Sequence, residues 1–334
     1  MRTAAQAIAG GLRRVRRSWG LSLLLLGVNL ATALILAAPL AGTLAKDFHE
    51  RPSGSSMMYG FDYPWWSQWS DTRTGWQATL GPDLLGKGFG LKNLDLLLKG
   101  QLPAGLFAVR DAEGKRPLLL DPLLLGIAAA YMLVQVFLAG GVLSVLRQAQ
   151  GQWTMRGMLH GAGFYFGRFV RVWALMMAAA AILFAVYGPL ARWADSQARE
   201  AVSEATAEAW LLGRHAVLLL ALVFLHLVGT YARVITVLEE RSSAVLAVLS
   251  GLSFAFTRLL STMAIAGGMA IVFVLALALW QMFDQAWTTI GYRTQLVTLL
   301  AMQALVLARI SLRLALAGAL MDLYRRHTAE GAQA

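Results

Sequence analysis

Six runs of apolar residues, each near the length of a membrane-spanning helix, follow one another along the chain. They cover residues 21–44, 122–146, 170–190, 211–231, 259–283 and 290–312. A helix needs about 20 residues to cross the roughly 30 Å hydrocarbon core of a bilayer. None of the six runs contains an aspartate or a glutamate. The pattern predicts an all-α membrane protein with six transmembrane helices.

Composition supports a membrane protein and excludes several chemistries. Of the 334 residues, 58% are hydrophobic and 14% are charged, against about 25% charged in a soluble domain. The chain has no cysteine, which excludes disulfides and thiolate metal sites. The run 21–44 follows a basic segment as in a secretory leader, but it exceeds the 7 to 15 apolar residues of such a leader. We therefore expect it to be the first span.

Charge is divided unequally between the two faces that six spans create. One face consists of segments 1–20, 147–172, 232–261 and 309–334. It holds 16 Lys/Arg and 4 Asp/Glu, a net charge of +12. The rest of the chain holds 13 Lys/Arg and 14 Asp/Glu, a net charge of −1. Loops rich in Lys and Arg stay in the cytoplasm. The distribution predicts that both the N-terminus and the C-terminus are cytoplasmic.

An internal repeat precedes two of the runs. A shift of 90 residues places Leu159–Val170 over Leu249–Leu260, with Leu, Gly, Phe, Phe and Arg in common. A weaker third copy is Ile8–Trp19, with Gly10 and Arg17 at the corresponding positions. We expect these segments to be amphipathic helices at the cytoplasmic interface. The fold would then consist of tandem repeats of two-span units around an axis along the membrane normal.

The domain organisation follows from these patterns. Residues 1–20 form a basic interfacial segment, and residues 21–334 form the six-helix bundle, with an aromatic-rich extracytoplasmic insertion at 46–117. The insertion places a group of candidate ligand or partner residues together: Asp62, Trp65, Trp66 and Trp69. Tyrosine and tryptophan also favour the headgroup layer of a bilayer. The sequence leaves open whether the insertion binds a ligand or lies on the outer leaflet.

Few polar residues fall inside the predicted spans. The candidates for intramembrane function are Asn29, Gln135, His226 and Gln303. Arginines at the cytoplasmic ends are candidates for lipid headgroup contacts, namely Arg168, Arg258, Arg309 and Arg313. No residue pattern indicates a catalytic site, a metal site, a cofactor or nucleic-acid binding. We therefore expect a protein that is not an enzyme.

Two stretches, GFDYPWWSQW at 60–69 and ARVITVLEERSSAVLAVLSG at 232–251, resemble segments of uncharacterised bacterial six-span membrane proteins. The resemblance implies a bacterial cytoplasmic (inner) membrane location. It transfers no activity and no functional residue.

The spans favour one class of activity over another. A bundle without intramembrane carboxylates offers little to a hydrated ion and more to a lipid-like molecule. We expect a transport or permease-type protein for an apolar or amphipathic substrate. The alternative is a scaffold or assembly subunit that binds a partner through the extracytoplasmic segment. The expected partners are anionic lipids at the cytoplasmic face and a membrane protein or a second copy of the chain.

Overall fold

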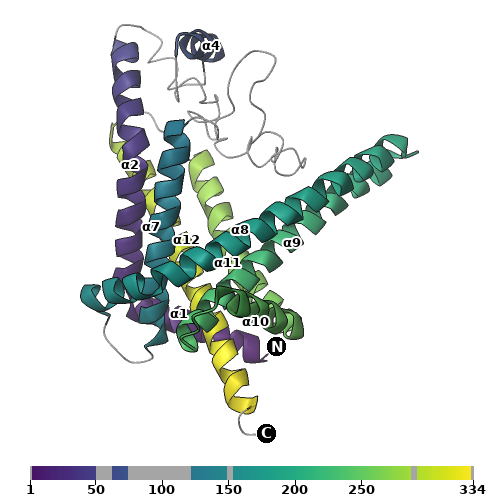
Figure 1. Ribbon diagram of the computed structural model, residues 1–334. Coiled ribbons are helices and arrows are strands. Elements are labelled where there is room, and N and C mark those ends of the chain that lie inside the picture. The colour runs from purple at the N-terminus through teal and green to yellow at the C-terminus, as the bar shows by residue number, and fades with distance from the viewer. Residues whose placement is uncertain (1, 50–61, 74–121, 149–152, 287–291, 332–334) are drawn as a thin grey trace. The chain divides into compact units, whose positions relative to one another are not determined.

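Long helices make up the chain in a computed structural model, which describes residues 2–49, 62–73, 122–148, 153–286 and 292–331 (Figure 1). In chain order the helices are α1 (Arg2–Arg17), α2 (Trp19–His49), α4 (Tyr63–Asp71), α7 (Pro122–Arg147), α8 (Met155–Glu200), α9 (Glu204–Leu238), α10 (Ala244–Thr257), α11 (Leu259–Ala286) and α12 (Tyr292–Gly331). The described residues contain no strand. The all-α prediction is confirmed.

Five of these helices are long and apolar enough to cross a membrane, and the number is six if the bent pair of α1 and α2 counts as one span. Every predicted apolar run lies within one helix, apart from residues 290 and 291, which lie outside the described residues. The runs 122–146 and 259–283 nearly coincide with α7 and α11. Helix α7 starts at Pro122, whose missing backbone N–H costs nothing in the first turn of a helix.

The helices that contain the other runs extend far beyond them. Helix α8 has 46 residues and α12 has 40, so they are about 69 Å and 60 Å long at 1.5 Å per residue. Both lengths exceed the hydrocarbon core of a bilayer. Helix α12 extends well past residue 312, where the last apolar run ends. Helix α12 continues because its following residues bury an apolar face that includes Leu314, Ala315 and Ala319.

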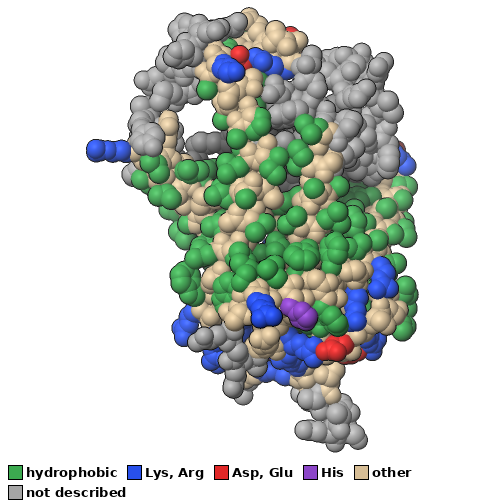
Figure 2. Space-filling view, turned by 60° about the vertical axis from the view of Figure 1, so that its left-hand side comes forward, with side chains coloured by type: hydrophobic (Ala, Val, Ile, Leu, Met, Phe, Trp, Pro, Cys, Tyr) green, Lys and Arg blue, Asp and Glu red, His purple; other side chains and the backbone are tan. Residues whose placement is uncertain are grey.

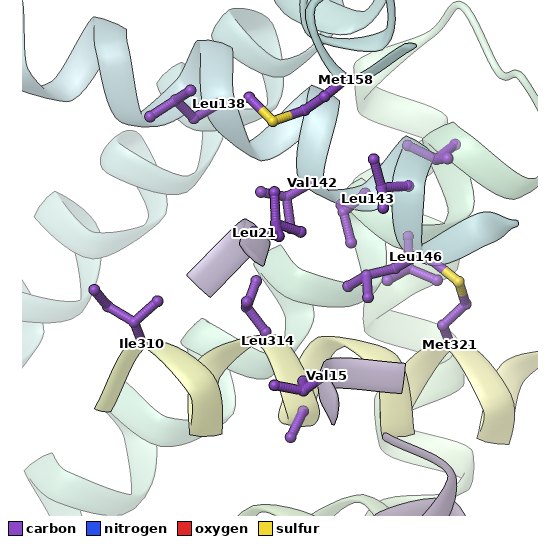
Figure 3. Close-up of a cluster of buried hydrophobic side chains, with 14 of the residues drawn as sticks. Val15, Leu21, Leu138, Val142, Leu143, Leu146, Met158, Ile310, Leu314 and Met321 are labelled. Carbon is purple, nitrogen blue, oxygen red and sulfur yellow. The ribbon is translucent and has the colours of Figure 1, made fainter. Parts of the chain in front are cut away.

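The chain divides into two compact units. Unit 1 comprises Met1–Leu36, Leu133–Leu175 and His226–Ala334, and unit 2 comprises Ala37–Met132 and Met176–Leu225. The core of unit 1 is formed by side chains from both ends of the sequence and from α7 (Figure 3). Its members include Val15, Leu21, Leu138, Val142, Leu146, Ile310 and Leu314. In unit 2, Tyr187, Ala191 and Leu218 form a smaller cluster between α8 and α9.

The segments that precede the spans differ in shape. Helices α1 and α2 meet at Ser18 with a bend of 74°. Helix α10 ends at Thr257, and one residue, Arg258, separates it from α11. Residues 159–170 are helical, but they belong to the continuous α8 and do not form a short helix of their own. Their position at the cytoplasmic interface stays a prediction. At the end of α10 the Thr257 hydroxyl donates to the Phe254 carbonyl at 3.1 Å. Gly167, at the equivalent position of α8, has no such side chain.

Helix α1 is amphipathic and packs across α12, as Figure 1 shows near the two chain ends. Its buried face consists of Ala4, Ala7, Gly11 and Val15, whereas Arg13, Arg16 and Arg17 are exposed. The buried positions recur at intervals of three and four residues, as expected for one face of a helix. The apolar face thus docks on protein, and the basic face is open.

Three glycines in unit 1 make the same kind of helix crossing. Each glycine contacts two residues of a neighbouring helix that are four positions apart. The first of the two contributes its carbonyl oxygen to the contact. The three sets are Gly11 with Ala315 and Ala319, Gly161 with Gly140 and Ser144, and Gly251 with Val228 and Ala232. A side chain at any of these glycines would overlap its neighbour. The equivalent residue in the first copy is therefore Gly11, not Gly10 as the alignment predicted.

Candidate functional site

The C-terminal end of α7 is capped by arginines from the two ends of the chain. The last four carbonyl groups of a helix have no partner within that helix. Arg14 of α1 donates to the Leu146 carbonyl at 2.6 Å, and Arg325 of α12 donates to the Arg147 carbonyl at 2.8 Å. Cations also interact favourably with the negative end of the helix dipole. These bonds fasten α1 and α12 to the end of α7.

The C-terminal end of α9 is capped in the same way from α7 and α8. Arg147 donates to the Val237 carbonyl at 3.0 Å, and Arg168 donates to the Glu240 carbonyl at 2.9 Å. Glu240 has a positive φ of 53°, which is costly for a residue with a side chain. The two arginines hold it there, since Arg147 also pairs with the Glu240 carboxylate at 2.8 Å.

Acidic residues complete this arrangement. Asp322 pairs with Arg14, and the two side chains are only 16% and 19% exposed. Glu239 pairs with Arg241 at 2.5 Å and accepts a hydrogen bond from the Tyr324 hydroxyl. We call these residues the polar end of unit 1: Arg14, Arg147, Arg168, Glu239, Glu240, Arg241, Asp322, Tyr324 and Arg325. Figure 2 shows Lys and Arg side chains gathered with acidic ones below the apolar surface.

The arginines predicted to contact lipid headgroups have different surroundings. Arg168 has protein partners, since its guanidinium also lies over the rings of Phe164 and Tyr165 at 4.9 Å and 5.8 Å, a cation–π arrangement. Arg258, Arg309 and Arg313 are exposed. For these three, headgroup binding stays a prediction.

The polar residues predicted inside the spans do not form one group. Gln135 of α7 donates to the Asn29 side chain of α2 at 3.3 Å, which satisfies two polar groups that would be costly in hydrocarbon. His226 is exposed on α9, and Gln303 is half-buried on α12. The structure joins the first two residues and leaves the other two apart from that pair.

In unit 2 the three tryptophans of α4 are buried. Trp65, Trp66 and Trp69 are 5%, 4% and 4% exposed and pack against Leu40 and Leu44 of α2. Their rings lie 5.0 to 6.5 Å apart, the usual separation of packed aromatic side chains. The cluster attaches α4 to α2, so these rings have a packing role.

One carboxylate of α2 fixes this cluster. Asp47 accepts a hydrogen bond from the Trp69 indole at 2.8 Å and pairs with Arg73. The Arg73 guanidinium lies 5.0 Å from the centre of the Trp69 ring. The sequence did not single out Asp47 or Arg73. A polar residue 22 positions before Trp69 gives no local signal of this contact.

The candidate ligand residue Asp62 caps α4. Its side chain accepts a hydrogen bond from the Trp65 backbone N–H at 3.0 Å, as expected for aspartate at the N-cap. The remaining residues of the insertion at 46–117 lie outside the described residues, except 46–49 and 63–73. A ligand or partner role for Asp62 stays a prediction.

Replacing Asp62 with alanine should loosen α4 without affecting unit 1. Loss of an N-cap aspartate costs about 1 kcal/mol. We expect the Asp62→Ala variant to show faster proteolysis near α4 in detergent, while the thermal midpoint of the whole protein changes little. The exposed acid Asp71, at the other end of α4, provides the control, because Asp71→Ala leaves the cap in place. Equal proteolysis of both variants would show that the cap contributes nothing.

Among the described residues, no three His, Asp or Glu side chains gather in a metal-binding arrangement. Comparison with known proteins provides no relative from which a function can be transferred: no protein-family model, no curated protein and no solved structure matches the chain. The resemblance to bacterial six-span proteins stays a prediction. The function has to be argued from the helices and their side chains.

Proposed function

We propose that this chain is a six-span protein of the bacterial inner membrane, with both termini cytoplasmic, that handles an apolar or amphipathic, lipid-like substrate. Helix α2 supplies the first span in this proposal, and α1 is the basic interfacial segment that precedes it. Helices α7, α8, α9, α11 and α12 supply the other five, as their length and apolar character allow.

The recurring glycine crossing carries the proposal. In this proposal each two-span repeat begins with a segment that precedes its first span. The glycines of these segments contact the second span of another repeat, Gly11 on α12, Gly161 on α7 and Gly251 on α9. The first segment packs on the last span, α12, so the three contacts close a ring within unit 1. Tandem repeats around an axis along the membrane normal are common in transporters. The crossing therefore supports three two-span repeats arranged as in a transport protein.

The chemistry of the spans favours an amphipathic substrate. The six apolar runs contain no carboxylate, and ion-coupled transporters usually place an ionisable group near the middle of the membrane. The Asn29–Gln135 pair provides a hydrogen-bonding group between α2 and α7. Such a pair can contact a polar headgroup without the cost of a buried charge.

Reconstitution into liposomes tests this proposal. Vesicles made from inner-membrane lipids with a fluorescent phospholipid in both leaflets are treated with an impermeant quencher. We expect the protein to make the inner-leaflet label accessible, and Gln135→Trp to reduce this activity. Leu133→Trp is the matched control, because Leu133 lies on the same helix and is 46% exposed. Lack of label movement with the folded wild-type protein would contradict transport of lipid-like molecules.

Purification in native-lipid nanodiscs separates this function from a scaffold role. We expect a bound lipid or amphiphile and no stoichiometric protein partner. A partner that co-purifies in a fixed ratio would favour the scaffold. The buried Trp65, Trp66 and Trp69 are a poor choice for mapping such a partner, because replacing them would disturb the attachment of α4.

A further inference from the structure

Helix α10 is apolar but too short to cross a bilayer. Its 14 residues extend about 21 Å at 1.5 Å per residue, less than the roughly 30 Å of the hydrocarbon core. An apolar helix of this length usually lies either in the core of a protein or at the edge of the membrane, within one leaflet. The exposure of its side chains distinguishes the two positions.

The side of α10 that packs on protein consists of small residues. They are Ala244, Ala247, Gly251 and Ala255, and they recur at intervals of three and four residues, as expected for one face of a helix. Gly251 lies so close to α9 that an added Cβ would come within 2.9 Å of the Ala232 backbone nitrogen. This side therefore fastens α10 to the neighbouring helix.

The opposite side of α10 carries large apolar side chains that are exposed. They are Val245 at 53%, Leu246 at 56%, Leu249 at 54%, Leu252 at 41% and Phe256 at 70%. We call these five residues the outer face of α10. A helix at a water-facing surface has the reverse pattern, with its polar side chains outward. Contiguous exposed apolar residues mark a surface that contacts lipid or another protein.

The residues that follow α10 favour lipid. Helix α11 begins after one residue, Arg258, and exposed apolar side chains continue along it, such as Leu260 at 87% and Ile271 at 63%. Helix α11 is long and apolar enough to cross a membrane, so acyl chains would cover these side chains. Helix α10 contains no charged residue, and Arg258 stands between the two helices. An arginine at the end of an apolar segment usually reaches the headgroup layer.

The ends of α10 suit a position with little water, where an unsatisfied backbone group is costly. At the first end the Ser243 side chain accepts a hydrogen bond from the Leu246 N–H at 3.4 Å. At the last end the Arg258 N–H and the Thr257 hydroxyl both donate to the Phe254 carbonyl at 3.1 Å. These bonds satisfy polar groups that would otherwise need water.

The other two segments that precede spans have outer sides of a different chemistry. Helix α1 exposes Arg13, Arg16 and Arg17, and the start of α8 exposes Arg156 and His160. Cationic side chains of this kind suit the headgroup layer. The three segments pack on their neighbours through equivalent glycines, but only the outer face of α10 is matched to acyl chains.

We propose that α10 lies just beneath the headgroups of one leaflet, with its outer face against the acyl chains and Arg258 among the headgroups. This leaflet is the one in which α9 ends and α11 begins. The proposal rests on the spans α9 and α11 of the proposed function, and it does not depend on transport of a substrate. It makes the bilayer itself the partner of the outer face.

Nitroxide labels on single cysteines test this position, because the natural chain has no cysteine. The protein is labelled at Leu249→Cys or Phe256→Cys and placed in liposomes of phosphatidylcholine and phosphatidylglycerol. Electron paramagnetic resonance then measures collisions of the label with oxygen, which collects among acyl chains, and with a water-soluble nickel chelate. We expect oxygen to reach both labels better than the chelate does. A label at Arg13→Cys, on the exposed side of α1, is the control at which this order should reverse.

A label at Leu275→Cys separates this proposal from the proposed function, because Leu275 is 59% exposed on α11. It should be reached by oxygen and not by the chelate. If it is, but the chelate reaches the labels on α10 as it reaches that at Arg13, the position of α10 is overturned and the span α11 stands. If the chelate also reaches Leu275, the span itself fails. Labels on α10 that neither reagent reaches would show that protein covers the outer face, which also overturns the proposal. Only variants that elute as single species are compared.

Discussion

Replacing Gly11 with alanine is expected to destabilise the protein by about 2 kcal/mol or more, at the upper part of the range for an overpacked site. The added methyl group would overlap the carbonyl oxygen of Ala315 in α12, which is a backbone atom and cannot rotate away. Helix α1 would have to move off α12. The measurement is the thermal midpoint in detergent, together with the fraction of protein that elutes as a single species.

Matched glycines make this prediction specific. A methyl group added at Gly27, Gly163 or Gly267 would meet no atom within 4 Å apart from its chain neighbours and the backbone of its own helix. Alanine there should be neutral or stabilising by about 0.5–1 kcal/mol, because alanine has the higher helix propensity. Gly161→Ala and Gly251→Ala should destabilise as Gly11→Ala does. If alanine lowered the stability equally at the glycines of the helix crossings and at the glycines with free space around them, the three equivalent crossings would be contradicted.

Replacing Arg14 with glutamine is expected to cost about 2 kcal/mol, the usual contribution of hydrogen bonds to a charged group. Arg14 holds the Leu146 carbonyl and the Asp322 carboxylate at once. Glutamine lacks the charge and the reach to keep both bonds, so it leaves a helix-end carbonyl and a half-buried carboxylate without their partner. Urea or thermal unfolding in detergent measures the loss.

The neighbouring Arg13 is the control for Arg14. Arg13 is exposed and bonds to the Ala9 carbonyl in its own helix, so Arg13→Gln should change stability by less than about 0.5 kcal/mol. The double variant Arg14→Gln/Asp322→Asn should cost less than the sum of the two single changes, because each removes the same ion pair. Strict additivity would show that the Arg14–Asp322 pair does not contribute.

The sequence predicted the helices well because their signal is local. Runs without charge, such as 122–146, are long enough to indicate a span by themselves. The ends of the helices were harder to predict. Helix α12 continues past Arg309 and Arg313 because its later residues pack against α1, a contact between the two ends of the chain that no local pattern reveals.

The side-chain partners were the least predictable part. Asn29 and Gln135 were recognised as unusual polar residues in apolar runs, but their pairing across 106 positions appears only in the fold. Arg168 was predicted to contact lipid, and the structure gives it the Glu240 carbonyl. Arg14, Arg147 and Asp322 were missed because a charged residue near a span end is common in any membrane protein. What distinguishes them is the carbonyl or carboxylate they contact, and the sequence does not show it.

The topology of the chain can be measured directly, because the natural sequence has no cysteine. Single cysteines are introduced at Ala5, Val202, Ser242 and Thr328, all of which are exposed. Intact spheroplasts are then treated with an impermeant maleimide, with and without permeabilisation. Six spans with both ends cytoplasmic predict that Val202→Cys is labelled from outside and that the other three react only after permeabilisation. Labelling of Ala5→Cys from outside while Thr328→Cys stays protected would show that the first helix pair does not cross, and would contradict the six-span account.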